Sequence, residues 1–190
     1  PRATMKIAIG QIGTDADKTA NFALVAQAVI TAAMNHARLI LFPEATMRAF
    51  GTGRLDEIAE PLDGPFVSAL AGLAKNYNIA IVVGMFRPAD QHVVSGRTIN
   101  RVYNTTVAIC PDGTVVHYDK IHTYDAFGYR ESDTIKPGEN LVTFTYNAVT
   151  FGLATCYDLR FPQQFRQLAR RGADIILVPT SWADGPGKLQ

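Results

Sequence analysis

The chain has 190 residues, of which 47% are hydrophobic and 18% are charged, and its formal net charge is +1. This length is enough for one domain with a sizeable core, and the composition is ordinary for a soluble globular protein. The balanced charge gives no indication of nucleic acid or an anionic membrane as the main partner. We therefore expect residues 1–190 to form a single domain that binds neither.

The cysteine content and the N-terminus indicate a reducing compartment. Two cysteines, Cys110 and Cys156, provide no disulfide framework. The N-terminal residues lead directly into a strand-like run, without the apolar core of a signal peptide. No apolar run approaches the roughly 20 residues that span a bilayer. These features predict a cytoplasmic protein.

The first half of the chain alternates strand and helix patterns. Apolar runs predict strands at residues 6–12, 39–42 and 79–86. Helical spacing of apolar residues predicts one helix that starts after Asp15 and Asp17 and extends through Ala33, and a second over residues 66–77. Residues 45–63 contain several breakers and residues 88–100 are polar, so we expect irregular structure in both segments.

The second half begins with hairpins and ends with another helix and strand. Residues 102–110 and 114–120 predict two strands joined by a Pro-Asp-Gly turn. Residues 121–137 show no regular pattern. A hairpin is predicted around Asn147-Ala148, followed by a helix at 163–171 and a strand at 175–178. Strand–helix alternation combined with hairpins favours an α/β fold with a mixed sheet and helices packed against it.

Residues 149–162 are the most informative stretch of the sequence. The apolar run 149–155 predicts a buried strand, and the polar turn that follows reaches Pro162 and opens a helix. Cys156 therefore lies where a strand ends and a turn into a helix begins. This geometry exposes a side chain at the edge of a sheet and brings the next backbone N–H near it. The alternative is a buried structural cysteine, because free cysteines are among the most buried residues.

Two further reactive side chains lie at predicted strand ends. Glu44 follows the strand at 39–42, and Lys120 ends the strand at 114–120. Ligand sites in open α/β sheets lie beyond the carboxyl ends of strands, so the three side chains can converge. A thiol needs a base or a nearby cation to become a nucleophile. Glu44 can accept its proton, and Lys120 can stabilise an oxyanion together with the Tyr157 N–H. Taken singly, Glu44 and Lys120 also fit ordinary surface charges, and periodicity does not show that the three meet.

Three segments of the sequence resemble the catalytic segments of the nitrilase superfamily, the carbon–nitrogen hydrolases. They stand in the family's order: Phe42-Pro43-Glu44, Asp119-Lys120-Ile121-His122 and the segment from Thr155 to Pro162. The resemblance extends from Lys6 to Gln190. It implies an α-β-β-α sandwich that commonly dimerises and works without a cofactor. The implied roles are Cys156 as nucleophile, Glu44 as general base, Lys120 as oxyanion stabiliser, Glu131 as a second glutamate that positions substrate and supports Lys120, Tyr157 as oxyanion amide and Trp182 as a pocket residue.

The segment from Cys156 to Pro162 most resembles the Nit-type branch of the superfamily. That resemblance implies an amidase for ω-amides of dicarboxylic acids or for deaminated glutathione. An N-carbamoyl amidohydrolase, a nitrilase and a catalytically silent scaffold are the alternatives. Gln163 stands where the branch usually has a glutamate. Family members continue beyond the position of Gln190, so we expect this chain to lack the C-terminal portion of the sandwich.

Other polar residues have simpler interpretations. Cys110 precedes a turn without a nearby base and is expected to be structural. The four histidines lack paired metal-ligand spacing, so we expect no metal site, and His122 is expected to form a hydrogen bond near Lys120. Asp158 and Arg160 flank the turn at Cys156 and are expected to form an ion pair that holds it.

Overall fold

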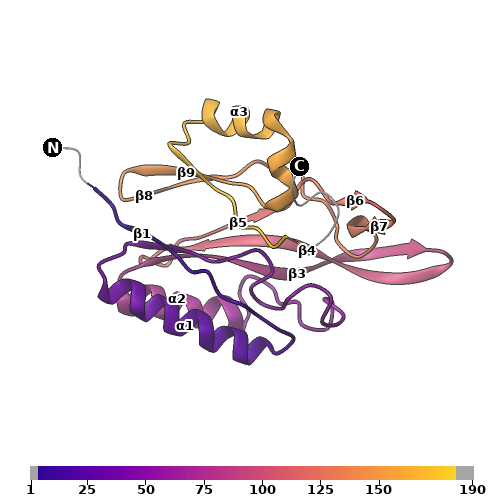
Figure 1. Ribbon diagram of the computed structural model, residues 1–190, viewed down its shortest axis with the longest axis horizontal. Coiled ribbons are helices and arrows are strands. Elements are labelled where there is room, and N and C mark those ends of the chain that lie inside the picture. The colour runs from indigo at the N-terminus through magenta and orange to yellow at the C-terminus, as the bar shows by residue number, and fades with distance from the viewer. Residues whose placement is uncertain (1–3, 183–190) are drawn as a thin grey trace.

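The structure, a computed structural model, describes residues 4–182 and contains two main sheets that lie face to face (Figure 1). The first sheet has the order β1-β2-β3-β4-β5; β1, β2 and β3 are parallel, and β4 is antiparallel to both its neighbours. The second has the order β10-β9-β8, with β9 parallel to β10 and antiparallel to β8. The strands of the first sheet are β1 (Ile7–Ile9), β2 (Leu39–Leu41), β3 (Ala80–Val94), β4 (Arg97–Ile109) and β5 (Val115–Asp119). Those of the second are β8 (Thr143–Tyr146), β9 (Val149–Leu153) and β10 (Ile175–Leu177).

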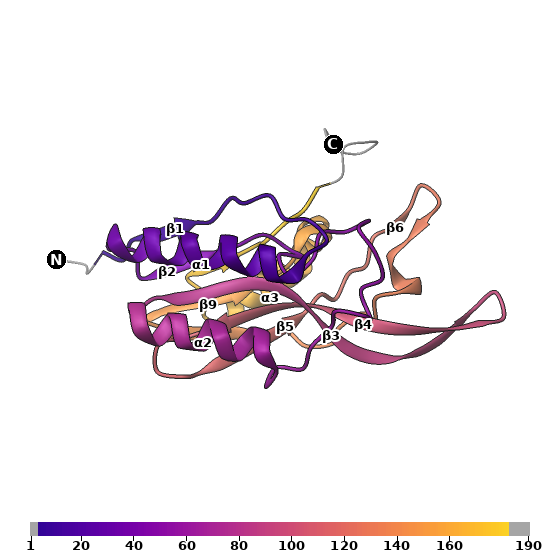
Figure 2. The ribbon, with the colours of Figure 1, turned by 90° about the horizontal axis from the view of Figure 1, so that it is seen from below.

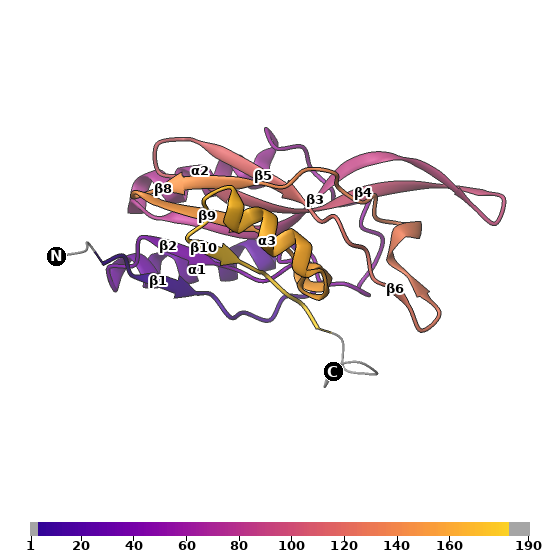
Figure 3. The same ribbon diagram turned by 90° about the horizontal axis from the view of Figure 1, so that it is seen from above.

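Helices cover the outer faces of both sheets. Helices α1 (Lys18–Met34) and α2 (Pro65–Tyr77) lie against the first sheet (Figure 2), and α3 (Pro162–Arg170) lies across the second (Figure 3). The layers therefore follow the expected order of helix, sheet, sheet and helix. None of the helices within residues 4–182 has the length and apolar character needed to span a bilayer.

The ends of the two long helices carry recognisable sequence signals. The Asp17 carboxylate accepts hydrogen bonds from the backbone N–H groups of Thr19 and Ala20 at the start of α1. Pro65 opens α2, where its missing N–H costs nothing, and Asn78 ends it in the left-handed conformation. These signals explain why both helices lie close to their predicted positions.

The hydrophobic core has two parts, one on each face of the first sheet. Ile81 packs in the cluster beneath α1 and α2, while its neighbour Val82 packs in the cluster between the two sheets. Both are fully buried. A strand buried on both faces has no polar side, which explains the continuous apolar run of residues 79–86.

The prediction of irregular structure at residues 88–100 is wrong, because β3 and β4 continue through this segment as a long hairpin. The hairpin projects beyond the rest of the sheet (Figure 1). Its turn uses Ser95 at φ 48° and Gly96 at φ 75°, and two consecutive left-handed residues are typical of a two-residue hairpin turn. Pairing is irregular between Pro88 and Gln91, where proline cannot donate to the ladder. Because most side chains near the tip are exposed, the sequence lacks the apolar alternation that marks a half-buried strand.

The segment 121–137, for which we predicted no regular structure, contains only short elements. A small hairpin of β6 (Asp125–Ala126) and β7 (Tyr129–Arg130) leads into the single-turn helix η1 (Glu131–Asp133). The Asp125 carboxylate accepts hydrogen bonds from the backbone N–H and the hydroxyl of Ser132, which tie the hairpin to η1. This segment brings Glu131 toward the end of β5.

Candidate active site

Glu44, Lys120 and Cys156 lie at the same end of the two sheets. Glu44 follows β2, Lys120 directly follows β5, and Cys156 follows β9. The Lys120 ammonium lies 3.4 Å from Glu44 Oε1. The charges of both groups act on the Cys156 thiol. All three residues are buried, with exposed fractions of 3%, 1% and 8% in chain order.

The Glu44 carboxylate is held by two neutral donors as well as by Lys120. Asn104 Nδ2 on β4 lies 2.8 Å from Oε1, and the Ser181 N–H lies 3.1 Å from Oε2. The turn that carries Glu44 sits directly on β3, where the Gly84 N–H donates to the Pro43 carbonyl. A Cβ at Gly84 would lie 2.5 Å from the backbone nitrogen of Ala45, so only glycine permits this approach.

Lys120 forms its shorter ion pair with Glu131. Its Nζ lies 2.9 Å from Glu131 Oε1 and 3.1 Å from Oε2. The Tyr124 N–H also donates to Glu131 Oε2, at 3.4 Å. Glu131 is 5% exposed, so its carboxylate depends on these contacts in place of water.

The cluster holds two carboxylates and one ammonium, and its pKa shifts follow from that balance. Burial opposes the charge on Lys120, but the Glu44 and Glu131 carboxylates outweigh it and raise the pKa of Lys120. Burial also raises the pKa of Glu131, an effect that Lys120 only partly offsets. The lysine therefore stays charged between the two carboxylates.

Cys156 begins the single-turn helix η2 (Cys156–Arg160) in a left-handed conformation, with φ 46°. Such a conformation is uncommon for a residue with a side chain and is found at sharp strand-to-helix turns. The Cys156 N–H donates to the Pro179 carbonyl at 3.0 Å. Burial, together with the Glu44 carboxylate and against the opposing charge of Lys120, raises the pKa of the thiol to about 12. At neutral pH the thiol is therefore protonated and needs a base before it can attack.

Tyr157 and Trp182 lie beside this cluster. The Tyr157 ring packs edge to face against Tyr124 at 5.2 Å and against Phe161 at 5.4 Å. Trp182 is 47% exposed and follows Ser181, whose N–H contacts Glu44. The roles expected for the Tyr157 amide and the Trp182 side chain stay predictions.

The sequence does not predict the position of Asn104 or the hydrogen bonds that Asp158 accepts from Tyr118, His122 and Thr155. Asn104 is 1% exposed. Its backbone carbonyl accepts a hydrogen bond from the Lys120 N–H, and its side-chain amide donates one to Glu44. A polar run, Asn104-Thr105-Thr106, inside an apolar strand was the available signal. Asp158 holds the turn at Cys156 through bonds from Tyr118, His122 and Thr155. Its expected ion pair with Arg160 stays a prediction. His122 forms the hydrogen bond expected near Lys120, and its partner is Asp158.

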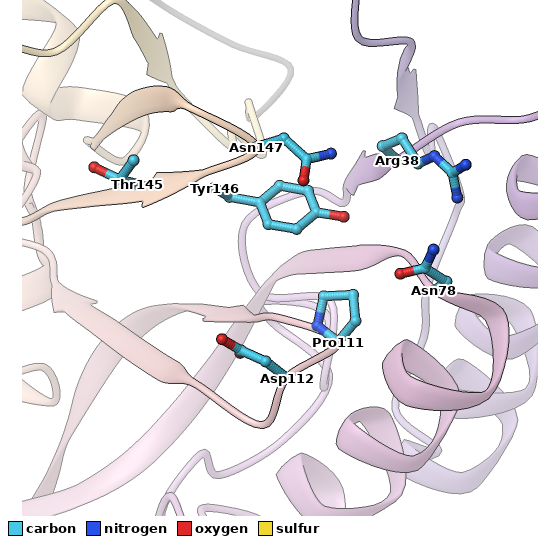
Figure 4. A pocket seen from close by; sticks show the side chains of 7 residues that line it. All are labelled: Arg38, Asn78, Pro111, Asp112, Thr145, Tyr146 and Asn147. Carbon is cyan, nitrogen blue, oxygen red and sulfur yellow. The ribbon is translucent and has the colours of Figure 1, made fainter.

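Two surface hollows of the described structure lie away from this cluster. One, of about 570 Å³, is at the opposite end of the sandwich (Figure 4), between the Arg38 and Tyr146 side chains and the turn at Pro111-Asp112. The other, of about 330 Å³, lies at the base of the β3–β4 hairpin near Asp90. Neither is lined by Glu44, Lys120, Glu131 or Cys156. Within the described part of the chain, no group of three or more histidine, cysteine, aspartate or glutamate side chains is arranged to hold a metal ion.

Known proteins resemble this chain along nearly all of its length. Residues 6–189 match the carbon-nitrogen hydrolase family. A hydrolase of Mycobacterium tuberculosis is 42% identical over 98% of this chain and 64% of its own length. An (R)-stereoselective amidase of a Pseudomonas species is 31% identical over 97% of this chain and 63% of its length. A deaminated glutathione amidase of Escherichia coli O157:H7 is 30% identical, with 97% and 68% covered. The chain thus spans about two thirds of the length of these relatives.

Solved structures confirm the nitrilase-like α/β fold with mixed sheets. The crystal structure of an amidase from Nesterenkonia sp. superposes with a TM-score of 0.80 and 25% identity, covering 97% of this chain and 68% of that one. A glutamate-to-glutamine mutant of the amidase from Nesterenkonia sp. AN1 shows Michael addition of acrylamide at its active-site cysteine.

Proposed function

Because the chain belongs to the carbon-nitrogen hydrolase family, we propose that it hydrolyses a carbon–nitrogen bond other than a peptide bond, with Cys156 as nucleophile. The observation that carries this proposal is the buried ammonium of Lys120, which lies within 3.4 Å of Glu44 and 2.9 Å of Glu131 beside the Cys156 thiol. A structural core has no need for three ionisable groups and a thiol in contact, because burying charge is costly.

In the proposed first half-reaction, the Cys156 sulfur attacks the carbonyl carbon of an amide while Glu44 takes the thiol proton. The carbonyl oxygen becomes an oxyanion, which the Lys120 ammonium stabilises. We assign the Tyr157 N–H as second donor, and one such donor contributes about 3–4 kcal/mol. Glu44 then gives its proton to the leaving nitrogen, the carbon–nitrogen bond breaks, and a thioester remains.

In the second half-reaction, water attacks the thioester carbon as Glu44 takes one of its protons. A second oxyanion forms beside Lys120 and collapses, releasing the carboxylic acid. Glu44 returns the proton to the Cys156 sulfur. Glu131 keeps Lys120 charged and in place throughout, so Lys120 is the electrostatic stabiliser and Glu44 is the group that moves protons. No cofactor enters this sequence of steps.

For the substrate we propose a small amide, with an ω-amide of a dicarboxylic acid or a deaminated-glutathione-like amide as first candidate. The segment from Cys156 to Pro162 supports this choice through its resemblance to the Nit-type branch. The two amidase relatives, at 31% and 30% identity, carry different names and do not separate the candidates. Carbamoyl amino acids and nitriles are the alternative substrates, and Trp182 is proposed to line the pocket.

The test is ammonia release from a panel of ω-amides, carbamoyl amino acids and nitriles. It compares the wild-type chain with Cys156→Ala and with the matched control Cys110→Ala, which also replaces a buried cysteine. Release from one class that disappears only in Cys156→Ala supports the hydrolase and identifies the substrate class. A folded chain that releases no ammonia, also when extended beyond Gln190, would favour the catalytically silent scaffold.

Three wider expectations accompany this proposal. We propose that residues 1–190 belong to a single carbon-nitrogen hydrolase domain, that the protein self-associates as a homodimer or larger homo-oligomer, and that it is cytoplasmic. Light scattering coupled to size-exclusion chromatography tests the oligomeric state. Cell fractionation tests the location.

A further inference from the structure

The Asp158 carboxylate is a fully buried charge that the proposed reaction does not use. Its Oδ2 accepts hydrogen bonds from the Thr155 N–H, at 2.9 Å, and from the Tyr118 hydroxyl. Its Oδ1 accepts from the His122 N–H at 3.0 Å, and the His122 Nδ1 lies 2.8 Å from the same oxygen. Since a carboxylate only accepts, that ring nitrogen carries the proton. Four donors therefore compensate the loss of water around this group.

The first of these bonds closes the turn that carries Cys156. Thr155 and Asp158 form a reciprocal capping box, in which each side chain accepts from the backbone N–H of the other. Cys156 is enclosed in this turn in its left-handed conformation. A non-glycine residue relaxes from that conformation unless the surrounding bonds hold it. Asp158 thus supplies a restraint on the direction of the Cys156 side chain.

The other bonds attach the same carboxylate to the segment that carries Lys120. Tyr118 precedes Lys120 by two residues and His122 follows it by two residues. The Tyr118 hydroxyl also accepts from the Ile121 N–H at 3.1 Å and from Gln164 Nε2 at 2.8 Å. One buried carboxylate therefore joins the end of β5 to the turn after β9.

His122 extends this connection to the end of the turn. Its ring stacks on Phe161, with ring centroids 3.6 Å apart and planes inclined by 7°. Phe161 is the residue that ends η2 and precedes α3. The His122 side chain thus contacts the turn both at Asp158 and at Phe161.

We propose that Asp158 is a positioning residue that fixes the Cys156 thiol relative to the Lys120 ammonium. It acts through Thr155 on one side and through Tyr118 and His122 on the other, and it does not touch the substrate. This inference rests on the proposed role of Cys156 as nucleophile. Its consequence is that loss of the Asp158 bonds misplaces the thiol even in a folded protein.

The direct test measures the rate at which acrylamide adds to Cys156, followed by mass spectrometry of the intact chain and its peptides. In Asp158→Asn, the new amide NH2 group replaces one oxygen and must face the two donors of that oxygen, one of which is the backbone N–H of Thr155 or of His122. At least that bond is therefore lost in either orientation. We expect addition to slow by roughly 10- to 100-fold, the effect of a misplacement near 1 Å. The matched control is Asp119→Asn, because Asp119 lies next to Lys120 but accepts its bonds from Arg87 and Thr105. We expect wild-type reactivity of Cys156 in this control.

A second pair of variants covers the case in which Asp158→Asn does not fold. His122→Leu removes the ring donor to Asp158, whereas His122→Asn retains a side-chain N–H near the same place. Slow addition in His122→Leu and restored addition in His122→Asn support the inference. Equal rates in the folded His122 variants, or a wild-type rate in folded Asp158→Asn, overturn it.

The outcome is separable from that of the proposed function. A chain that releases no ammonia but whose Cys156 reactivity depends on Asp158 contradicts the function and supports the positioning role. In an active chain, Asp158→Asn should lower kcat while leaving KM close to the wild-type value. Loss of folded protein alone would leave kcat per folded molecule unchanged.

Discussion

The Lys120 ammonium lies 2.9 Å from the Glu131 carboxylate, and side chains of both residues are more than nine-tenths buried. Removing one partner of such a pair leaves the other charge buried without compensation, which costs about 3–5 kcal/mol. We expect Glu131→Gln to reach only the low end of this range, because Glu44 remains near Lys120. The measurement is urea unfolding of the wild type and the variant at neutral pH.

The control for this prediction is Glu57→Gln. Glu57 also pairs with a cation, at 3.7 Å from Arg54, but its side chain is 60% exposed. An exposed pair contributes at most about 1 kcal/mol, so this variant should lie close to the wild type. Equal losses in the two variants would contradict a buried pair.

Glu44→Gln should have opposite effects on two reactions of Cys156, slowing hydrolysis and letting acrylamide addition start at a lower pH. Without a base, turnover should fall by about 10²–10⁴-fold. The Glu44 carboxylate raises the pKa of Cys156, whereas Lys120 lowers it, so removal of the carboxylate should bring the thiol pKa down from about 12. Acrylamide addition to Cys156 should therefore begin at a lower pH in the variant than in the wild type. An unchanged pH profile would show that Glu44 does not act on the thiol.

The proximity of Glu44, Lys120 and Cys156 could be anticipated because each lies at the end of a predicted strand. Apolar runs indicate the strands before Glu44 and Cys156, the Pro-Asp-Gly turn indicates the strand that leads to Lys120, and the order of the three residues matches a known family. The hydrogen bonds of Asp158 could not be predicted in this way, because its partners Tyr118 and His122 lie 40 and 36 residues away in the sequence. Only packing of the second sheet on the first brings them together.

Asn104 and the β3–β4 hairpin illustrate two further limits. Whether a mid-strand residue such as Asn104 faces the site depends on the register of β4 against β3 and β5, which single-sequence periodicity does not determine. The hairpin at 88–100 has exposed residues on both faces near its tip, so it lacks the apolar alternation by which strands are recognised.

Gly84→Ala should disturb the Glu44 turn. The new Cβ would lie 2.5 Å from the Ala45 nitrogen and 2.8 Å from the Pro43 carbonyl oxygen, and backbone atoms must move to accommodate it. We expect a loss of about 1–3 kcal/mol in the free energy of unfolding and a lower hydrolysis rate. The control is Gly72→Ala in α2, where nothing lies within 4 Å of the new Cβ and a gain of about 0.5–1 kcal/mol is expected. Destabilisation by both substitutions would contradict the close approach at Gly84.

The Asp90–Arg101 ion pair at the base of the β3–β4 hairpin should stabilise the folded chain in a pH-dependent way. Arg101 Nε and Nη2 each lie 2.8 Å from an Asp90 carboxylate oxygen, and this pairing lowers the pKa of Asp90 from 3.8 to about 2. A carboxyl whose pKa is lower in the folded than in the unfolded chain stabilises the folded chain at any pH above its unfolded-state pKa. This stabilisation is lost as the pH falls toward the folded-state pKa. The stability difference between the wild type and Asp90→Asn should therefore be constant near neutral pH and should shrink between pH 3.8 and about 2. Urea unfolding across this range measures it, with the exposed Asp63→Asn as control. A difference that stays constant into acid would show that the Asp90–Arg101 pair does not stabilise the folded chain.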